Sequence, residues 1–127
     1  MTRQEKAQAL RDDKSFHYNC FHAVLTPFCE EYGLDAGTVK QMGIFLGGGV
    51  RHGSVCGAVL GAMAVLGLAG VEDEKGMELL NRFQEKRNSL ACKELLDAAY
   101  ARGEERKPHC DALICDTVAL VEELLGE

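Results

Sequence analysis

The segment from 55 to 70 is the feature that most constrains the fold, because it carries no charged side chain and consists of Gly, Ala, Cys, Met, Val and Leu. A helix that is apolar on nearly all sides is stable in water only when other elements surround it. The segment is shorter than the roughly 20 residues of a bilayer-spanning helix, so we expect no membrane partner. Ser54 is well placed to cap its first turn. We therefore predict a central, Gly/Ala-rich core helix over residues 55–69.

The remaining sequence has the apolar spacing of amphipathic helices. Apolar residues recur at three- and four-residue steps in five further segments, 18–32, 35–46, 72–87, 89–99 and 108–125. Asn19 and Asp35 are candidate N-caps of the first two, and Pro27 should kink or split the first. The residues expected to face the core include Met42, Ile44, Phe45 and Met77.

No segment of useful length alternates polar and apolar residues as a strand does. Together with the helical spacing, this predicts an all-α fold. We expect a single-domain helical bundle of about five to six helices over residues 1–127. Residues 1–15 are a candidate peripheral N-terminal helix of this bundle.

The net charge and the N-terminal residues argue against a nucleic-acid partner and against secretion. The net charge of −6 lacks the basic footprint of nucleic-acid-binding proteins, so we expect no nucleic-acid partner. The N-terminus is charged and no apolar run follows it, so we expect no secretory signal and a cytoplasmic location. In that reducing compartment the six cysteines favour metal binding, reversible thiol chemistry or packing over a static disulfide framework.

Four cysteines fall at the expected starts of four helices. They follow Asn19, Ser54, Ser89 and Pro108 by one to three residues, and they are Cys20, Cys56, Cys92 and Cys110. Unpaired backbone amides and the helix dipole favour negative charge in a first turn, so we expect the pKa of each of these thiols to fall. A thiolate is the form that binds a metal or attacks a disulfide. We therefore predict one site formed by these four cysteines.

The other two cysteines are expected to lie outside this site. Cys29 is nine residues from Cys20, and Cys115 is five residues from Cys110. At about 100° per residue, each is turned to the other side of its helix. Cysteine is among the most buried residue types, so we interpret Cys29 and Cys115 as small apolar core residues.

The glycine run and two histidines are candidate neighbours of the site. Gly47, Gly48 and Gly49 match neither nucleotide-binding glycine pattern. They either bring backbone amides close to a negatively charged centre near Cys56 or only end one helix and turn the chain.

His52 and His109 lie near Cys56 and Cys110 in the sequence. Each either contacts a sulfur, as a hydrogen-bond partner or spare ligand, or lies in a solvated loop. His17 and His22 are expected at the surface.

The chain resembles a family of redox-active proteins labelled by the pattern C, GCAxxG, C, C. The resemblance extends from Asn19 onward and rests on Cys20, the segment Gly47–Gly61, Cys92 and Cys110. In this chain the order within the motif is Cys-Gly-Ala, so only the cysteine, Cys56, is carried over from it. The resemblance implies an electron-transfer or redox role, and a similar segment occurs in split-Soret cytochromes beside an iron–sulfur centre. The chain has no Cys-x-x-Cys-His, so covalent haem is not expected.

Four thiolates meet the ligand count of a [2Fe–2S] or [4Fe–4S] cluster and of structural zinc. The nearest two, Cys92 and Cys110, are 18 residues apart, unlike the close pairs of common zinc and ferredoxin sites. We rank an iron–sulfur cluster first, a reversible disulfide relay without metal second, and zinc third. In the first two cases the partner is an unidentified redox protein. The alternative is a non-catalytic helical module, a homodimer built on the small-residue face of 55–69, whose cysteines only pack or bind zinc.

Overall fold

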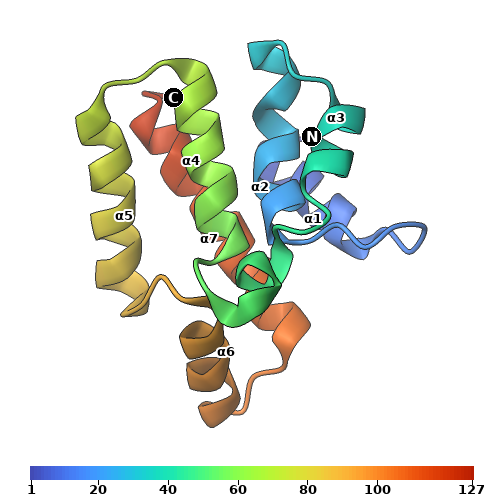
Figure 1. Cartoon of the computed structure of the whole chain (residues 1–127), viewed down its shortest axis with the longest axis vertical. Helices are drawn as coiled ribbons and strands as arrows, with labels where there is room; N and C mark the ends of the chain where they lie inside the picture. Colours follow the sequence, from blue (N-terminus) through green and yellow to red (C-terminus); the bar gives the residue numbers. More distant parts are fainter.

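The computed structural model describes residues 1–127, which form seven α-helices, two short helical turns and no named strand (Figure 1). The all-α prediction is confirmed. In chain order the elements are α1 (Arg3–Asp12), α2 (Cys20–Cys29), η1 (Glu30–Tyr32), α3 (Ala36–Met42), η2 (Gly49–Gly53), α4 (Gly57–Ala69), α5 (Asp73–Arg87), α6 (Cys92–Ala101) and α7 (Arg106–Leu124).

The number of helices exceeds the predicted five to six because the N-terminal segment forms a well-capped helix. The Thr2 hydroxyl accepts a hydrogen bond from the Glu5 backbone N–H, and the Glu5 side chain accepts one from the Thr2 N–H. This helix, α1, packs against α2 and α7, with Ala7 fully buried. It therefore closes one side of the bundle.

The predicted central helix is α4, which packs between α2, α5 and α7 (Figure 1). Two glycines of α4 allow it to pack closely against α2. A Cβ atom added to Gly57 would lie 3.1 Å from the backbone N of Phe21, and one added to Gly61 would lie 3.0 Å from the Phe21 carbonyl oxygen. The largest fully buried side chains of the protein are Phe28, Leu25, Leu79, Leu113, Ile114, His22, Val24, Val39, Val59, Val65, Val118 and Val121.

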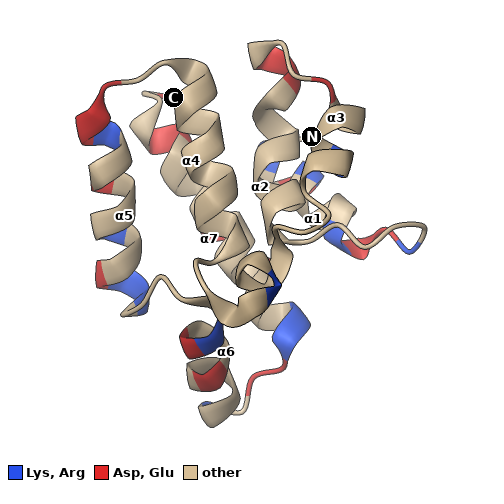
Figure 2. Cartoon of the chain, viewed as in Figure 1, with Lys and Arg blue, Asp and Glu red and all other residues tan.

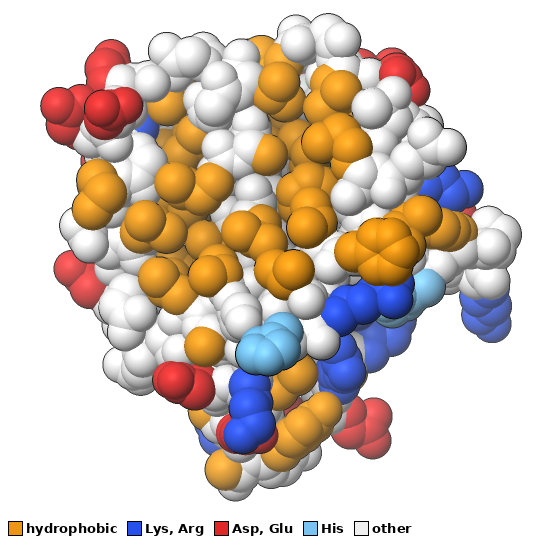
Figure 3. Space-filling model, in the orientation of Figure 1, with side chains coloured by type: hydrophobic (Ala, Val, Ile, Leu, Met, Phe, Trp, Pro, Cys, Tyr) orange, Lys and Arg blue, Asp and Glu red, His pale blue; other side chains and the backbone are white.

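Gly57 and Gly61 of α4 thus face α2, whereas Gly67 has no neighbouring atom within 4 Å. The helix carries no charged residue, and the charges lie on the surrounding elements (Figure 2). Its outer surface is apolar and includes exposed Leu68, and Val55 just before the helix is also exposed (Figure 3). No helix combines the length and the apolar character that crossing a bilayer requires.

The predicted cap Ser54 is wrong. Cys56 is the N-cap of α4, and the Ser54 hydroxyl hydrogen-bonds His52 instead.

Two helix boundaries also differ from the prediction. The second predicted helix ends at Met42 because Gly43 packs against α2: a Cβ atom there would lie 2.5 Å from Nε2 of His22. The last helix starts at Arg106 rather than near Pro108, and the proline is accommodated in its first turn, where backbone N–H groups need no helical acceptor. Four residues that were predicted to face the core are exposed instead: Met42, Ile44, Phe45 and Met77.

The segment from 18 to 32 shows how a proline is tolerated near a helix end. Pro27 lies inside α2, which continues for two more residues and passes directly into η1. Gly33, with a left-handed φ of 82°, then ends the helical path. Pro27 falls in the last turn of α2, so it does not split the helix. The first turn, where Cys20 lies, is intact.

Candidate functional site

Cys20 and Cys110 lie close together where α2 meets α7. Cys20 is the first residue of α2, and Cys110 is the fifth residue of α7. The interaction of the two thiols is the largest influence on the pKa of each. The packing of α2 on α7 therefore brings together two thiols that are far apart in the sequence.

Cys56 and Cys92 are joined by a short antiparallel bridge between Val55 and Ala91. The Cys56 N–H donates to the Leu90 carbonyl at 2.8 Å, and the Cys92 N–H donates to the Ser54 carbonyl at 2.7 Å. Cys56 is buried at the N-cap of α4, whereas Cys92 is partly exposed at the start of α6. The negative charges of Cys92 and Cys110 raise the pKa of Cys56, so the four thiols lie within electrostatic reach of one another.

The prediction that a helix start lowers the pKa of all four thiols is wrong. The hydrogen bond to Cys110, and then burial, raise the pKa of Cys20. Burial raises the pKa of Cys56 to about 11, although backbone N–H groups at the start of α4 oppose the shift. Burial also raises the pKa of Cys92. The loss of water around a buried thiolate outweighs the favourable helix dipole at these positions.

Cys110 is the exception, and its helix start is not the reason. Its pKa is lowered to about 7, first by the hydrogen bond from Cys20 and then, against the effect of burial, by the positive charges of Arg11 and Arg106. Arg106 lies one helical turn before Cys110, on the same face of α7. Cys110 is therefore the thiol of this group that ionises most readily.

We expect the alkylation rate of Cys110 to rise with pH through about 7 and then level off. At pH 7 about half of the thiol would be ionised, against roughly one part in a hundred for an unshifted pKa of 9.0. The groups that act on this thiol from the neighbouring elements are Arg11, Cys20, Cys56, Cys92, Arg106 and Asp111.

The measurement is iodoacetamide labelling followed by mass spectrometry in a Cys115→Ser background, since Cys110 and Cys115 lie only five residues apart. A Cys20→Ala variant removes the hydrogen-bond donor and should move the midpoint to higher pH. A midpoint near 9 in the parent protein would show that Cys20 and the arginines do not stabilise the thiolate.

Cys20 is held in place by a buried network around the start of α2. Asn19 caps the helix by accepting from the His22 N–H at 3.1 Å, and its amide donates to the Gly43 carbonyl at 2.7 Å. His22 Nδ1 accepts from the Asn19 N–H, so its Nε2 carries the proton and donates to the Lys40 carbonyl at 2.9 Å. His22 is 1% exposed, and its predicted surface position is wrong.

The glycine run turns the chain through a left-handed segment beside Cys92. Gly48, Gly49, Val50 and Arg51 have φ values of 62°, 63°, 60° and 54°. A Cβ atom on Gly49 would lie 2.5 Å from the Ser54 backbone and 2.8 Å from Cβ of Cys92, so only glycine fits. A left-handed β-branched residue costs on the order of 1–3 kcal/mol, so the surrounding contacts must hold Val50 in this conformation. The turn carries Arg51 to the rim of a cavity.

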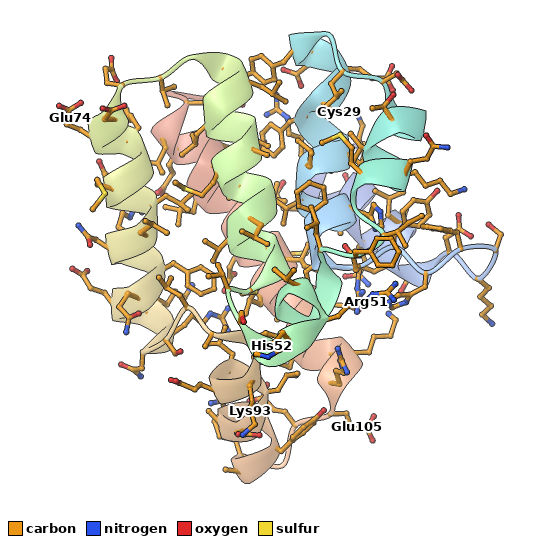
Figure 4. All side chains as sticks on the ribbon, viewed as in Figure 1. Cys29, Arg51, His52, Glu74, Lys93 and Glu105 are labelled. Carbon is orange, nitrogen blue, oxygen red and sulfur yellow. The ribbon has the colours of Figure 1, made fainter.

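This cavity of about 470 Å³ is lined by Cys20, Cys92 and Cys110 and is rich in positive charge. The other lining residues are Arg11, His17, Asn19, Ile44, Gly47, Gly48, Arg51, Gly53, Lys93, Leu96 and Arg106. Figure 3 shows Lys and Arg side chains gathered below the apolar surface of α4, and Figure 4 shows Arg51 and Lys93 beside the junction of η2 and α6. Three thiols thus share an open cavity with four basic side chains.

The two predicted histidine neighbours do not line the cavity. His52 is exposed and hydrogen-bonds the Ser54 hydroxyl at 3.2 Å. His109 is buried on another face of α7, in a hollow with Arg87 and Arg102, because adjacent helical residues point about 100° apart. Of its two predicted positions, the one in a solvated loop is therefore wrong.

The two cysteines expected outside the site do not line the cavity. Cys29 is a core residue whose thiol donates to the Thr26 carbonyl at 3.3 Å, far from Arg51 and Lys93 in Figure 4. Cys115 is only partly buried, so its interpretation as a core residue is wrong.

The basic side chains of the cavity were not identified from the sequence. One signal was available: Arg106 and Cys110 are four residues apart, the spacing of neighbours on one helix face. Arg11 and Arg51 gave no comparable signal, because their distance from the cysteines depends on the docking of α1 and on the left-handed turn.

The thiols are not arranged around a single metal ion. No group of three or more His, Cys, Asp or Glu side chains is placed to hold one. The four cysteines therefore share one region without the convergent ligand set of a zinc site.

Comparison with known proteins adds one finding. The model of a protein family described as "Putative redox-active protein (C_GCAxxG_C_C)" matches residues 18–124, which include all four cysteines of the site. No curated protein and no solved structure matches the chain significantly.

Proposed function

Since the chain belongs to the C_GCAxxG_C_C family of redox-active proteins, we propose that its redox chemistry is thiol–disulfide exchange through Cys110 and Cys20. The observation that carries the proposal is the proximity of these two thiols, which line the same open cavity and interact with each other. In such a pair the more readily ionised thiol attacks and its neighbour completes the exchange. Cys110 is the attacking thiol and Cys20 the second thiol.

The exchange proceeds in two balanced steps. The Cys110 thiolate attacks one sulfur of a substrate disulfide, forms a mixed disulfide and releases the first substrate thiolate. Cys20 then loses its proton and attacks Cys110 Sγ, which forms the Cys20–Cys110 disulfide and releases the second substrate thiolate. Two electrons pass to the substrate, and the two released thiolates take up two protons. A dithiol donor, of the class of cellular thiol reductants, reverses these steps and restores the protein.

Cys20 can act as the second thiol despite its high pKa, because the first step of the exchange removes the main cause of that high pKa. The hydrogen bond to Cys110 and the negative charge of Cys110 both raise the pKa of Cys20. Once Cys110 Sγ is part of a mixed disulfide, it carries no charge, and only burial still opposes ionisation of Cys20. Arg11, which lowers the pKa of Cys20, remains beside it.

Cys56 and Cys92 stay reduced in this scheme, since burial keeps their pKa values raised. The cycle needs a thiol pool to regenerate the dithiol, so we assign it to the cytoplasm.

The test is to map the disulfides of protein oxidised by one equivalent of a small disulfide. We expect a Cys20–Cys110 disulfide, with four free thiols left among the six cysteines. Cys29→Ser and Cys115→Ser are matched controls and should leave this disulfide intact. Oxidation that joins other cysteines, or none, would contradict the proposal.

The predicted iron–sulfur cluster is tested on the same protein. Three of the four cysteines line one cavity, which favours such a cofactor, although no three of them converge on a single ion. Visible absorption and the iron and zinc content of anaerobically purified protein measure it. Stoichiometric iron with a cluster spectrum that Cys20→Ser abolishes would replace the disulfide proposal.

A further inference from the structure

The cavity beside Cys110 is basic in a chain that is acidic as a whole. Its lining includes Arg11, Arg51, Lys93 and Arg106 and no carboxylate. The chain carries a net charge of −6, so this local excess of positive charge is not a general property of the surface. Clusters of one charge within a cavity attract ligands of the opposite charge.

Two of the four cations have no acidic partner. Arg51 donates to the Ile44 carbonyl at 2.9 Å and lies over the Phe45 ring, and Arg106 lies against Gly48. Neither forms an ion pair with a carboxylate. Their charges are therefore available to a ligand.

The other two cations are partly compensated. Arg11 pairs with Asp111 at 2.8 Å, and Lys93 lies 3.9 Å from Asp97 in an exposed, weak pair. Together with burial, Arg11 and Arg106 still lower the pKa of His17 in the same cavity, so their positive potential extends across it.

The size of the cavity fits a small molecule better than a protein loop. A volume of about 470 Å³ lies within the usual range of small-ligand sites, roughly 300–1,000 Å³. Cys110 lies in the wall of this cavity with Cys20, so a disulfide bound there reaches the attacking sulfur directly. The thiolates released by the exchange are also anions, which the same cations stabilise.

We infer that this cavity selects small disulfides that carry carboxylate groups, with Arg106 and Arg51 as the residues that bind the negative charge. The inference rests on the proposed exchange at Cys110 and adds the chemical class of its substrate.

The test compares three small disulfides of different charge. The probes are 2,2′-dithiodiacetate, bis(2-hydroxyethyl) disulfide and cystamine, which carry two negative charges, none and two positive charges at pH 7. Stopped-flow measurements give the rate constant of each with the reduced protein. Each value is divided by that of 2-mercaptoethanol with the same probe, which removes the intrinsic reactivity of the disulfide. We expect the normalised rate of the dianion to exceed that of the neutral probe by about tenfold or more at low salt, with the dication slowest. The difference should shrink as ionic strength rises.

Variants separate charge selection from reactivity. Arg106→Gln and Arg51→Gln should each reduce the dianion-to-neutral ratio severalfold. The ratio is the readout because any change in the ionisation of Cys110 affects both probes equally. Arg82→Gln, which removes a paired arginine on α5, lowers the net charge equally and should leave the ratio unchanged.

The outcomes distinguish this inference from the proposal on which it rests. Equal normalised rates for the three probes would overturn the charge selection and leave the exchange at Cys110 intact. An unchanged ratio in both arginine variants would show that these residues do not bind the substrate. If no probe forms a mixed disulfide with Cys110, the proposed function itself fails.

Discussion

Replacing Cys110 by serine is expected to reduce the rate of disulfide reduction by on the order of a hundredfold or more. The Cys110 thiolate is the attacking group, and its pKa of about 7 keeps a large share of it ionised near neutral pH. A serine hydroxyl at this position stays protonated and cannot replace it. The measurement is the stopped-flow rate with bis(2-hydroxyethyl) disulfide, whose neutrality removes any effect of cavity charge.

Two further variants make this result specific. Cys115→Ser changes a partly buried cysteine on the same helix that does not line the cavity, so it should react at close to the parental rate. Cys20→Ser keeps the attacking thiol but lacks the second one, so it should accumulate the mixed disulfide at Cys110, which intact-mass analysis detects. Equal losses in Cys110→Ser and Cys115→Ser would mean that the site has been assigned to the wrong face of α7.

Replacing Gly61 by valine should have the largest effect on stability, about 1–3 kcal/mol or more. The new Cβ atom would lie 3.0 Å from the carbonyl oxygen of Phe21 and 3.1 Å from Cβ of Val24. A backbone oxygen cannot move away as the end of a flexible side chain can, so α2 must shift away from α4. Because Cys20 precedes Phe21, the shift should also weaken its contact with Cys110 and raise the pKa of that thiol.

Urea denaturation measures the free energy of unfolding, and the pH profile of alkylation measures the contact of the two thiols. Gly67→Val is the matched control, because it makes the same substitution in the same helix at a position with no neighbouring atom within 4 Å. Both variants make the same change in helix propensity. The difference between their free energies of unfolding therefore measures the packing at Gly61. Equal stabilities would show that the close approach of α2 and α4 is not limited by Gly61.

Much of the fold follows from short-range signals. Asn19 and Asp35 are the caps expected from their side chains, and Gly33 ends the helical path after α2. The central position of α4 follows from its apolar composition. The errors occur where a contact from another helix overrides the local pattern, as where Gly43 packs on His22 and leaves Phe45 exposed.

The candidate site was predictable only in part. The sequence separates four cysteines from Cys29 and Cys115. Three of these four line the cavity, whereas Cys29 and Cys115 do not. It gives the wrong direction for the pKa of Cys20, Cys56 and Cys92, because the helix dipole can be read from position but burial cannot. It also misses the role of Arg11, which reaches the thiols from a different helix.

The sequence by itself determined most of the helices, the caps Asn19 and Asp35 and the cysteine set, because helical hydrogen bonds, capping and apolar period involve residues only a few positions apart. The tertiary structure alone decided that Cys20 contacts Cys110, that the left-handed turn brings Arg51 to the cavity, and that one thiol ionises more readily than the others. The physical reason is that a thiolate responds to the water, charges and donors around it, and these come from helices that meet only when α2, α4 and α7 pack together.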